Sequence, residues 1–547
     1  MSVEWSTVRT ERTVLAIVHN TTAATRLFDI LPLFATDPRV QTIFTCPGSS
    51  AFTNGTHEYL AKAGIDVLPW AEALERPADL AIAASYGGDL HKVKAPLMVV
   101  PHGMGYNKYL DSEGRSGVFG LSADWLTHEG RVVPSVVVLS HEEQLERLTA
   151  ACPEAREVAL VAGDPCFDRM LASLPLREAY RQALGVDPGT KLIVISSTWG
   201  GESLLGNDLQ LAQRLATSLD MDAYRIAVAL HPNISAHHSS WQVRMWLDHC
   251  RRAGVLALPE ERFWCQALVA ADLTLGDHGS VSFYSAALGT PVILVSAPAE
   301  AVAPDSPIAR LLAVAPRLTE DPVRQIEEVI AGHDPLRTAA ITSCTTSLPG
   351  TSGTVLSETI YRHLGLDPVR ADLRVLPVPE VEIPEPRAHL ARVEFRRGEA
   401  VVTRFPADSL REPRRAPDRT HLVVDVRETS ARLLDNADIV VHHHPRDPES
   451  WISAQLRSLP GCALALARGQ DGWFAGTDDG GLVRFDGLTG PADAFASALY
   501  QLPVGAIPGS LRVRVGGRPH QARVTVLRTA RRAAPRPSPP HAESRTG

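Results

Sequence analysis

The sequence predicts an α/β protein in which two Rossmann-like, doubly wound domains face a cleft and a C-terminal mixed α/β domain follows. Short apolar runs alternate with helical patterns over about the first 365 residues, which is typical of parallel sheets buried on both faces. The alternation starts again near residue 171, which indicates a second sheet. A Pro-rich segment then marks a third domain, and 547 residues leave room for about three.

The first predicted domain spans residues 1–170. It begins with a buried strand at 14–18 and an amphipathic helix at 21–35, and a second helix is expected at 57–63. The remaining strands are short apolar runs, at 40–44, 65–68, 80–84, 97–100, 136–139 and 158–161.

The second predicted domain spans residues 171–368. A helix near 176–184 leads into strands at 192–195, 226–230 and 255–258, and a helix at 353–364 closes the domain. Two doubly wound sheets in series bind ligands in the cleft between them, beyond the carboxyl ends of their strands. We therefore expect the functional residues to follow strands.

The most informative segment, 272–295, has the pattern of a buried strand, a Gly-Ser turn, a helix, a Gly-Thr-Pro turn and a second strand. Gly279 and Ser280 are expected at the helix N-terminus, where free N–H groups and the helix dipole favour an anion such as a diphosphate. A Gly-Ser loop before a helix also occurs for structural reasons alone, and that alternative stays open.

Two histidines follow predicted strands. His102 follows strand 97–100 and precedes Gly103, and an imidazole there can take a proton near neutral pH. His231 follows strand 226–230 and can donate to a phosphate oxygen. Thr198 lies in a polar, Gly-rich segment after strand 192–195. A capping role in a strand-end turn is the alternative for both histidines.

The order of the motifs is more specific than any one of them. His102-Gly103 with Lys108 comes first, and the later motifs are 163–170, Ser-Thr-Trp at 197–199, His231-Pro232 and 277–280 with Gly-Thr-Pro at 289–291. Over about residues 90–300 this succession resembles the CDP-glycerol glycerophosphotransferases, the family of the teichoic-acid polymerases.

The resemblance implies a GT-B transferase, with His102 matching the general base and His231, Gly279 and Ser280 matching the group that holds the donor's diphosphate. Asp277 and Asp168 match aspartates of two family motifs. The remaining candidates have supporting roles: Thr198 in donor binding, then Gly103, Lys108 and His278.

The chain departs from the family pattern at several positions. Pro101 replaces a tryptophan, Gly200 replaces an arginine, and His278-Gly279 replaces Tyr-Ser. Tyr284 stands where an acidic residue is expected, so the usual acceptor for ribose hydroxyls is lost and the nucleotide is left open. The His-Pro-Asn and Gly-Ser segments also resemble UDP-N-acetylglucosamine 2-epimerases and nucleotide-sugar glycosyltransferases.

Three functions follow from these observations. The leading one is transfer of a glycerol-phosphate, polyol-phosphate or glycosyl group from a nucleotide-diphosphate donor to a hydroxyl acceptor, in cell-envelope polymer synthesis. The alternatives are a nucleotide-sugar epimerase or hydrolase, and a non-catalytic relative that binds a ligand or partner. No cofactor or metal is expected: Asp164 and Asp277 are not spaced as metal ligands, Asp164 is expected to cap a turn, and His237-His238 is expected in solvent.

Composition limits the partners. A net charge of −8 argues against specific nucleic-acid binding, and no apolar run reaches the length of a membrane helix. The N-terminus lacks a signal-peptide pattern, and the seven cysteines are expected as reduced thiols. The expected partners are a nucleotide-activated donor and a polymer-linked or lipid-linked acceptor. The expected location is the cytoplasm, with peripheral contact at the inner membrane face as the alternative.

The C-terminal part is predicted as a Pro-rich linker at 369–388, an accessory α/β domain at 389–528 and a disordered Arg- and Pro-rich tail at 529–547. Strands are expected at 391–395, 400–405, 421–426, 437–442, 462–467, 473–476, 482–485 and 511–526. Three consecutive histidines at 442–444 are interpreted as a polar strand end, since they cannot all face one ion. The sequence assigns this domain no chemistry.

Overall fold

The computed structural model describes residues 7–50, 52–109, 117–369, 373–407, 420–502 and 506–529. The chain forms two compact units. Unit 1 comprises Met1–Leu215, Arg225–Arg251 and Val255–Ile383, and unit 2 comprises Ala216–Tyr224, Arg252–Gly254 and Pro384–Gly547. The predicted tail beyond residue 529 lies outside the described residues.

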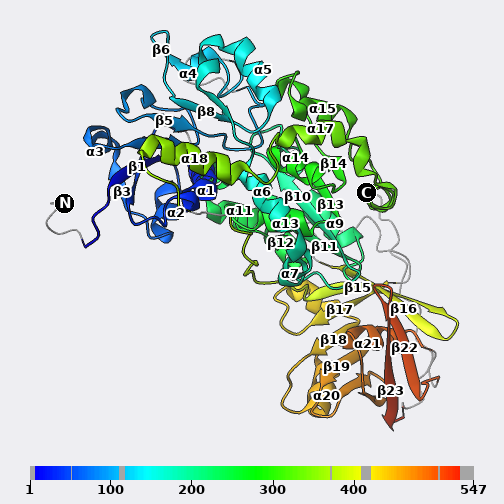
Figure 1. The fold of residues 1–547 in the computed structure, drawn as a ribbon. Coiled ribbons are helices and arrows are strands. Elements are labelled where there is room, and N and C mark those ends of the chain that lie inside the picture. The colour runs from blue at the N-terminus through cyan, green and yellow to red at the C-terminus, as the bar shows by residue number, and fades with distance from the viewer. Residues whose placement is uncertain are drawn as a thin grey trace, which may run out of the picture. The chain divides into compact units, whose positions relative to one another are not determined.

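Unit 1 begins with a seven-stranded parallel sheet in the order β3-β2-β1-β4-β5-β8-β9 (Figure 1). Its strands are β1 (Arg12–Ile17), β2 (Val40–Cys46), β3 (Val67–Pro69), β4 (Leu80–Ala83), β5 (Leu97–Val99), β8 (Val136–Leu139) and β9 (Ala159–Val161). Buried apolar runs form these strands, as the sequence predicts, because both faces of a parallel sheet are covered.

The helices of the first sheet differ in length from the prediction. Helix α1 (Thr21–Ile30) ends five residues earlier than expected, and a 3₁₀ turn at Leu31–Leu33 follows. Pro32 stands at the start of that turn, where its ring is accommodated but where it would break an α-helix interior. The other helices used below are α2 (Thr56–Lys62) and α5 (Glu142–Ala151).

The second sheet has five strands in the order β12-β11-β10-β13-β14. They are β10 (Lys191–Ser197), β11 (Tyr224–Leu230), β12 (Leu256–Ala257), β13 (Leu273–Gly276) and β14 (Val292–Leu294). Its helices include α6 (Pro165–Ala172), α8 (Leu204–Asn207), α10 (Pro232–His238), α13 (Trp264–Ala270), α14 (Ser280–Ala287) and α15 (Pro307–Val314). The helix expected to close the second domain is α18 (Ser352–Leu364). Helix α18 returns to the first sheet and packs Leu356, Ile360 and Tyr361 into its core.

The second sheet confirms the predicted fold class, two Rossmann-like parallel sheets in series. The Pro-rich segment after residue 372 lies against this second half of unit 1. Tyr180 donates a hydrogen bond of 2.6 Å to the carbonyl of Leu376, and Gln266 donates one of 2.9 Å to the carbonyl of Pro377. The part of the segment up to residue 383 is therefore packed along this half of unit 1.

Unit 2 is mixed α/β, as predicted, and its nine strands close into a barrel. In spatial order they are β15 (Ala388–Arg396), β16 (Glu399–Pro406), β22 (Ser510–Val515), β23 (Arg518–Arg528), β21 (Leu482–Asp486), β20 (Trp473–Thr477), β19 (Leu464–Arg468), β18 (Ile439–His442) and β17 (Thr420–Asp425). Helix α21 (Ala492–Tyr500) shares one buried cluster with side chains from every strand, which places the helix inside the barrel.

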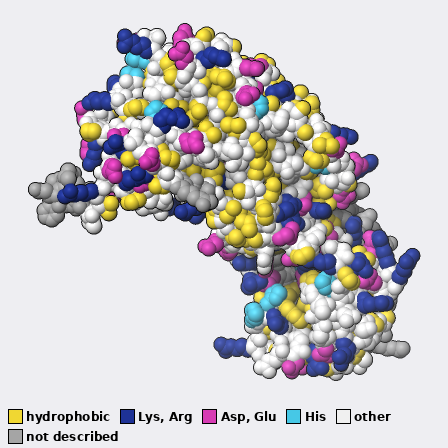
Figure 2. Space-filling view, in the orientation of Figure 1, with side chains coloured by type: hydrophobic (Ala, Val, Ile, Leu, Met, Phe, Trp, Pro, Cys, Tyr) yellow, Lys and Arg dark blue, Asp and Glu magenta, His cyan; other side chains and the backbone are white. Residues whose placement is uncertain are grey.

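Charge is distributed over the surface in both signs. Figure 2 shows Lys and Arg side chains interspersed with Asp and Glu side chains over the visible face. All seven cysteines are free. Within the described ranges, no helix is long and apolar enough to cross a membrane.

Candidate functional site

A cavity of about 600 Å³ opens in unit 1 at the carboxyl ends of the strands of both sheets. Eight of the ten predicted site residues line it: His102, Gly103, Lys108, Thr198, His231, His278, Gly279 and Ser280. Parallel strands deliver the residues that follow them to the same edge of a sheet, which is why motifs far apart in sequence meet here.

His102 follows β5 and is neutral at pH 7. One ring nitrogen bonds to the Ala84 carbonyl, while burial and the nearby charges of Arg26 and Lys108 lower the pKa of the imidazole to about 4. A carbonyl can only accept, so the bonded nitrogen carries the hydrogen and the other nitrogen keeps its lone pair. The ring edge packs against Phe119, with centroids 5.3 Å apart. His102 is thus free to accept a proton.

The loop that carries His102 passes directly over the N-terminus of α14. A Cβ atom placed on Gly103 would lie 2.7 Å from Oγ of Ser280, so a larger residue there would require the Ser280 side chain to move. Gly279 is the N-cap of α14 in an extended conformation, and no side chain caps the helix. The first-turn N–H groups of α14 therefore remain available to an anion in the cavity.

His231 is the N-cap of α10, which explains why the sequence places it before Pro232. Its Nδ1 accepts a hydrogen bond of 3.1 Å from the backbone N–H of Asn233, so Nε2 carries the hydrogen. Burial, followed by the charges of Lys108 and His102, lowers the pKa of His231 to about 3. At pH 7 His231 is a neutral hydrogen-bond donor.

Lys108 supplies the cation that these histidines lack. Its Nζ donates a hydrogen bond of 3.1 Å to Oγ1 of Thr198, which joins the first-sheet loop to the end of β10. Burial lowers the pKa of Lys108, and Asp277 opposes that effect. His278 lies near this charge: burial first, and Lys108 second, lower its pKa to about 4.

The two predicted aspartates lie behind the cavity wall and organise the backbone. The Asp277 carboxylate accepts N–H hydrogen bonds from Thr198, Leu204 and Gly279 at 2.8–2.9 Å, so it fixes the loop after β10 against the start of α14. Asp168 accepts from the N–H groups of Gly350 and Ser352, which holds the first turn of α18. In these positions both are positioning residues.

Other expectations have clear outcomes. Asp164 caps α6, as predicted, by accepting from the N–H groups of Cys166 and Phe167. Tyr284 donates a hydrogen bond of 2.6 Å to the other Asp164 oxygen. Its phenol is therefore bonded to the residue that caps α6. His237 and His238 are exposed at the end of α10, as expected.

Sequence reasoning missed three residues of the cavity. His19 follows the first strand, and the strand-end rule that selects His102 also applies to it. Arg26 lies within α1, where a single arginine gives no signal. Glu260 follows β12; burial raises its pKa to about 7, and Oγ of Ser235 donates to its carboxylate.

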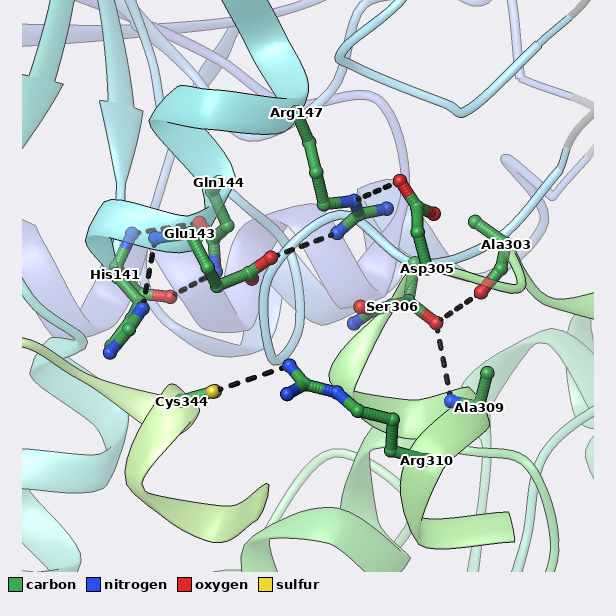
Figure 3. Close-up of polar contacts among 12 residues, drawn as sticks. His141, Glu143, Gln144, Arg147, Ala303, Asp305, Ser306, Ala309, Arg310 and Cys344 are labelled. Carbon is green, nitrogen blue, oxygen red and sulfur yellow. Dashed lines mark hydrogen bonds and ion pairs between the residues drawn. The ribbon is translucent and has the colours of Figure 1, made fainter. Parts of the chain in front are cut away.

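A polar cluster joins the two halves of unit 1 (Figure 3). Arg147 of α5 lies 3.3 Å from a carboxylate oxygen of Asp305, just before α15, and 3.6 Å from Glu143. Arg310 of α15 donates to the sulfur of Cys344 at 3.4 Å. Among the described residues, no three His, Cys, Asp or Glu side chains are grouped so as to hold a metal ion.

No protein-family model matches the chain, and no curated protein is detectably similar to it in sequence. Solved structures with a similar fold include the wall teichoic acid polymerase TagF, at 12% identity and a TM-score of 0.45 over 65% of this chain and 90% of that one. A UDP-GlcNAc 2-epimerase from Neisseria meningitidis bound to UDP-GlcNAc matches at 13% identity and a TM-score of 0.41, over 64% of this chain and 100% of that one. S. aureus MnaA with UDP matches at 11% identity and a TM-score of 0.39, over 66% and 99%. At these identities and scores, we draw nothing about activity from the likeness.

Proposed function

We propose that this protein transfers a glycerol-phosphate, polyol-phosphate or glycosyl group from a nucleotide-diphosphate donor to a hydroxyl acceptor. The observation that carries the proposal is the approach of the His102 loop to the N-terminus of α14, where Gly103 lies against Ser280. It brings a neutral imidazole with a free lone pair next to a helix end suited to a diphosphate.

The donor's diphosphate is held by the first-turn N–H groups of α14 and by Nε2–H of His231 in this proposal. The ammonium group of Lys108 offsets the negative charge that develops on the leaving group. Because Lys108 and His231 are half-buried, their electrostatic interaction with a bound diphosphate is stronger than in water.

The acceptor hydroxyl gives its proton to His102 as its oxygen attacks. Attack on the donor's outer phosphorus forms an O–P bond and releases a nucleoside monophosphate. Attack on an anomeric carbon forms an O–C bond and releases a nucleoside diphosphate. The released nucleotide therefore identifies the transferred group. Cell-envelope polymer synthesis is the setting that the motif resemblance suggests.

The first experiment is thermal unfolding of the full chain with CDP-glycerol, CMP, CDP, UDP-sugars and GDP-sugars. A ligand at about 100 times its Kd adds about 2.7 kcal/mol to the free energy of unfolding. We expect His231→Ala and Ser280→Ala to lose the stabilisation, and His102→Ala to keep it while losing transfer. His57→Ala, at an exposed histidine of α2, is the matched control. Turnover that survives His102→Ala would show that another group is the base.

A second candidate function rests on Glu260. A carboxylic acid with a pKa of about 7 inside the cavity is suited to proton transfer on the donor itself, as in epimerisation. This reaction needs no acceptor. Incubation of the chain with each nucleotide-sugar in D₂O, followed by NMR, separates the two functions: deuterium incorporation without an acceptor, lost in Glu260→Gln, would establish the epimerase.

A further inference from the structure

We propose that the first-sheet wall of the cavity is a second binding subsite, formed by His19, Thr22, Arg26 and Ser49, which holds the anionic group and a neighbouring hydroxyl of the acceptor. We call these four residues the acceptor subsite. The assignment of the ligand as an acceptor rests on the proposed function; the subsite itself rests on unpartnered polar atoms that line the cavity.

His19 provides the strongest observation. Its side chain is buried, with 1% of the residue exposed, and it lines the cavity. Nε2 lies 2.7 Å from the carbonyl oxygen of Gly87, so Nε2 donates and Nδ1 keeps a lone pair. That Nδ1 atom has no hydrogen-bond partner among the described residues. A buried acceptor without a donor is costly, and a ligand hydroxyl in the cavity satisfies it.

The other three residues carry unpartnered atoms of the same kind. Oγ1 of Thr22, Nε of Arg26 and Oγ of Ser49 are buried without a hydrogen-bond partner among the described residues. Most buried polar atoms in native proteins are paired with protein, water or ligand, and these four face the cavity from one wall. The wall is therefore complementary to a polar ligand.

The four side chains lie together. A Cβ atom on Gly87 would lie 3.1 Å from Oγ of Ser49 and 3.5 Å from Cδ2 of His19, so these two side chains are neighbours. Thr22 and Arg26 are four residues apart on α1 and share one helix face. Arg26 and His19 both contribute to the lowered pKa of His102, which places the acceptor subsite around the proposed base.

Arg26 gives the acceptor subsite its positive charge. Its guanidinium lies 3.1 Å from Asp29 and 5.5 Å from the ring centre of Trp264, with 11% of the side chain exposed. Asp29 also pairs with Arg169, so one carboxylate serves two guanidinium groups. Asp164, the next acid nearby, has a pKa raised by burial. Burial opposes ionisation of Arg26, but the neighbouring Cys166, Tyr284, Asp29 and Asp164 raise its pKa, so Arg26 stays charged, and the N-terminus of α1 adds positive potential.

These features define the ligand class as a polyol that carries a phosphate or a carboxylate. The anion contacts Nε of Arg26 and the hydroxyl of Thr22, while a ligand hydroxyl donates to Nδ1 of His19. The attacking hydroxyl is then presented to His102. Neutral polyols lack the group that Arg26 binds, so the acceptor subsite discriminates against them.

The test measures binding of glycerol 3-phosphate, glycerate and glycerol to the full chain by ligand-observed NMR, without nucleotide. We expect the first two to bind at millimolar concentration or tighter, and glycerol to bind at least about tenfold more weakly. The stronger of the two anions identifies whether phosphate or carboxylate is the natural group. Failure of both anions to bind would overturn the proposal.

Thr22→Val is the decisive variant, because the Thr22 hydroxyl has no partner within the described residues and its loss breaks no internal hydrogen bond. We expect unchanged thermal stability and about tenfold weaker anion binding. Arg26→Gln should abolish anion binding, and Thr149→Val, which removes a hydroxyl bonded to the Leu145 carbonyl and does not line the cavity, is the matched control.

Two outcomes separate this proposal from the proposed function. Anion binding that is lost in Thr22→Val and Arg26→Gln, in a chain that binds no nucleotide, supports the acceptor subsite and removes the transferase. Anion binding that is unchanged in both variants but lost in Ser280→Ala places the anion at α14 and overturns the acceptor subsite. If nucleotides still raise the unfolding temperature of Thr22→Val and Arg26→Gln, the donor site is independent of the acceptor subsite.

Discussion

At the scale of single residues, Gly103 is a position where the loop of His102 approaches the Ser280 side chain closely. Its Cβ would lie 2.7 Å from Oγ of Ser280, closer than atoms in contact approach. We expect Gly103→Ala to destabilise the chain by about 1–3 kcal/mol, the cost typical of an added methyl group in a filled space. Urea denaturation measures this effect.

The double variant Gly103→Ala/Ser280→Ala tests the cause, because it removes the oxygen that the new methyl group meets. Most of the lost stability should return. Gly201→Ala is the control, since nothing lies within 4 Å of a Cβ at that glycine. Equal destabilisation in the single and double variants would show that the clash is elsewhere.

His102 yields a prediction on pH. Its pKa of about 4 means that the base is already deprotonated at pH 7, so the rate of transfer should be flat from pH 7 to about 5 and fall below pH 4. Phe119→Ala admits water beside the ring, which raises the pKa and moves the acid limb of the rate profile upward. Phe395→Ala, at an exposed phenylalanine of unit 2, is the control and should leave the profile unchanged.

At the scale of elements, the sequence predicts the individual strands better than it predicts the closure of the unit 2 barrel. A buried strand is recognised from its own short apolar run. Every strand expected in the two sheets and in unit 2 overlaps a strand of the structure. Closure of the barrel also needs β16 to pair in parallel with β22, where Ala400 lies opposite Val513, a relation between distant segments that leaves no local pattern. Helix α21 is Ala-rich and buried nearly all round, so it shows no amphipathic stripe to predict it.

The candidate site also divides into residues that a local sequence pattern predicts and residues that it does not. Residues at strand ends could be found from sequence, because the strands themselves were visible. Arg26 could not, since its importance comes from the cavity that α1 borders and from the shared Asp29. Asp168 and Asp277 were found as motif residues, but only the structure reveals that they bind backbone N–H groups.

The cluster in Figure 3 joins α5 to the segment just before α15, and its ion pair gives a prediction on stability. Side chains of Arg147 and Glu143 are 9% and 16% exposed, and burial raises the pKa of Glu143. Arg147→Met leaves the buried Glu143 with Arg310 as its remaining nearby cation, so we expect a loss of about 2 kcal/mol in the free energy of unfolding.

Glu143→Gln in the same chain should recover much of that loss, because it removes the uncompensated charge. The control is Lys62→Met, which breaks the exposed pair with Glu58 and should leave the free energy of unfolding nearly unchanged. If Arg147→Met proves no more costly than this control, water rather than Arg147 stabilises the Glu143 carboxylate.

At the scale of the whole molecule, buried histidines make stability depend on pH. Burial lowers the pKa of six imidazoles, to about 3 for His231 and about 4 for His19, His102, His278, His389 and His421. Between pH 6.5 and 4 the unfolded chain binds these protons and the folded chain does not. Each contributes about 1.4 kcal/mol per pH unit to a free energy of unfolding that falls on acidification.

Buried acids oppose this trend, because their raised pKa values give the folded chain the extra proton. Burial raises the pKa of Asp220 to about 6 and that of Glu260 to about 7. Burial also raises the pKa of Glu143, Asp164 and Asp277, so five acids oppose the six histidines. The histidines outnumber them, and we expect the unfolding midpoint in urea to fall from pH 6.5 to 5. His278→Gln should make the free energy of unfolding depend less steeply on pH, by the equivalent of up to one bound proton. A midpoint that rises over this range would contradict the assignment of neutral imidazoles.

The helix inside the barrel has a consequence for unit 2. Barrels of eight or so strands that carry small molecules hold them in the lumen, reached from an open mouth. Here α21 occupies that lumen, and Phe495 and its neighbours are packed against side chains from every strand. The lumen of unit 2 is therefore filled by its own chain, and what the barrel presents to its surroundings is its loops and the outward faces of its strands.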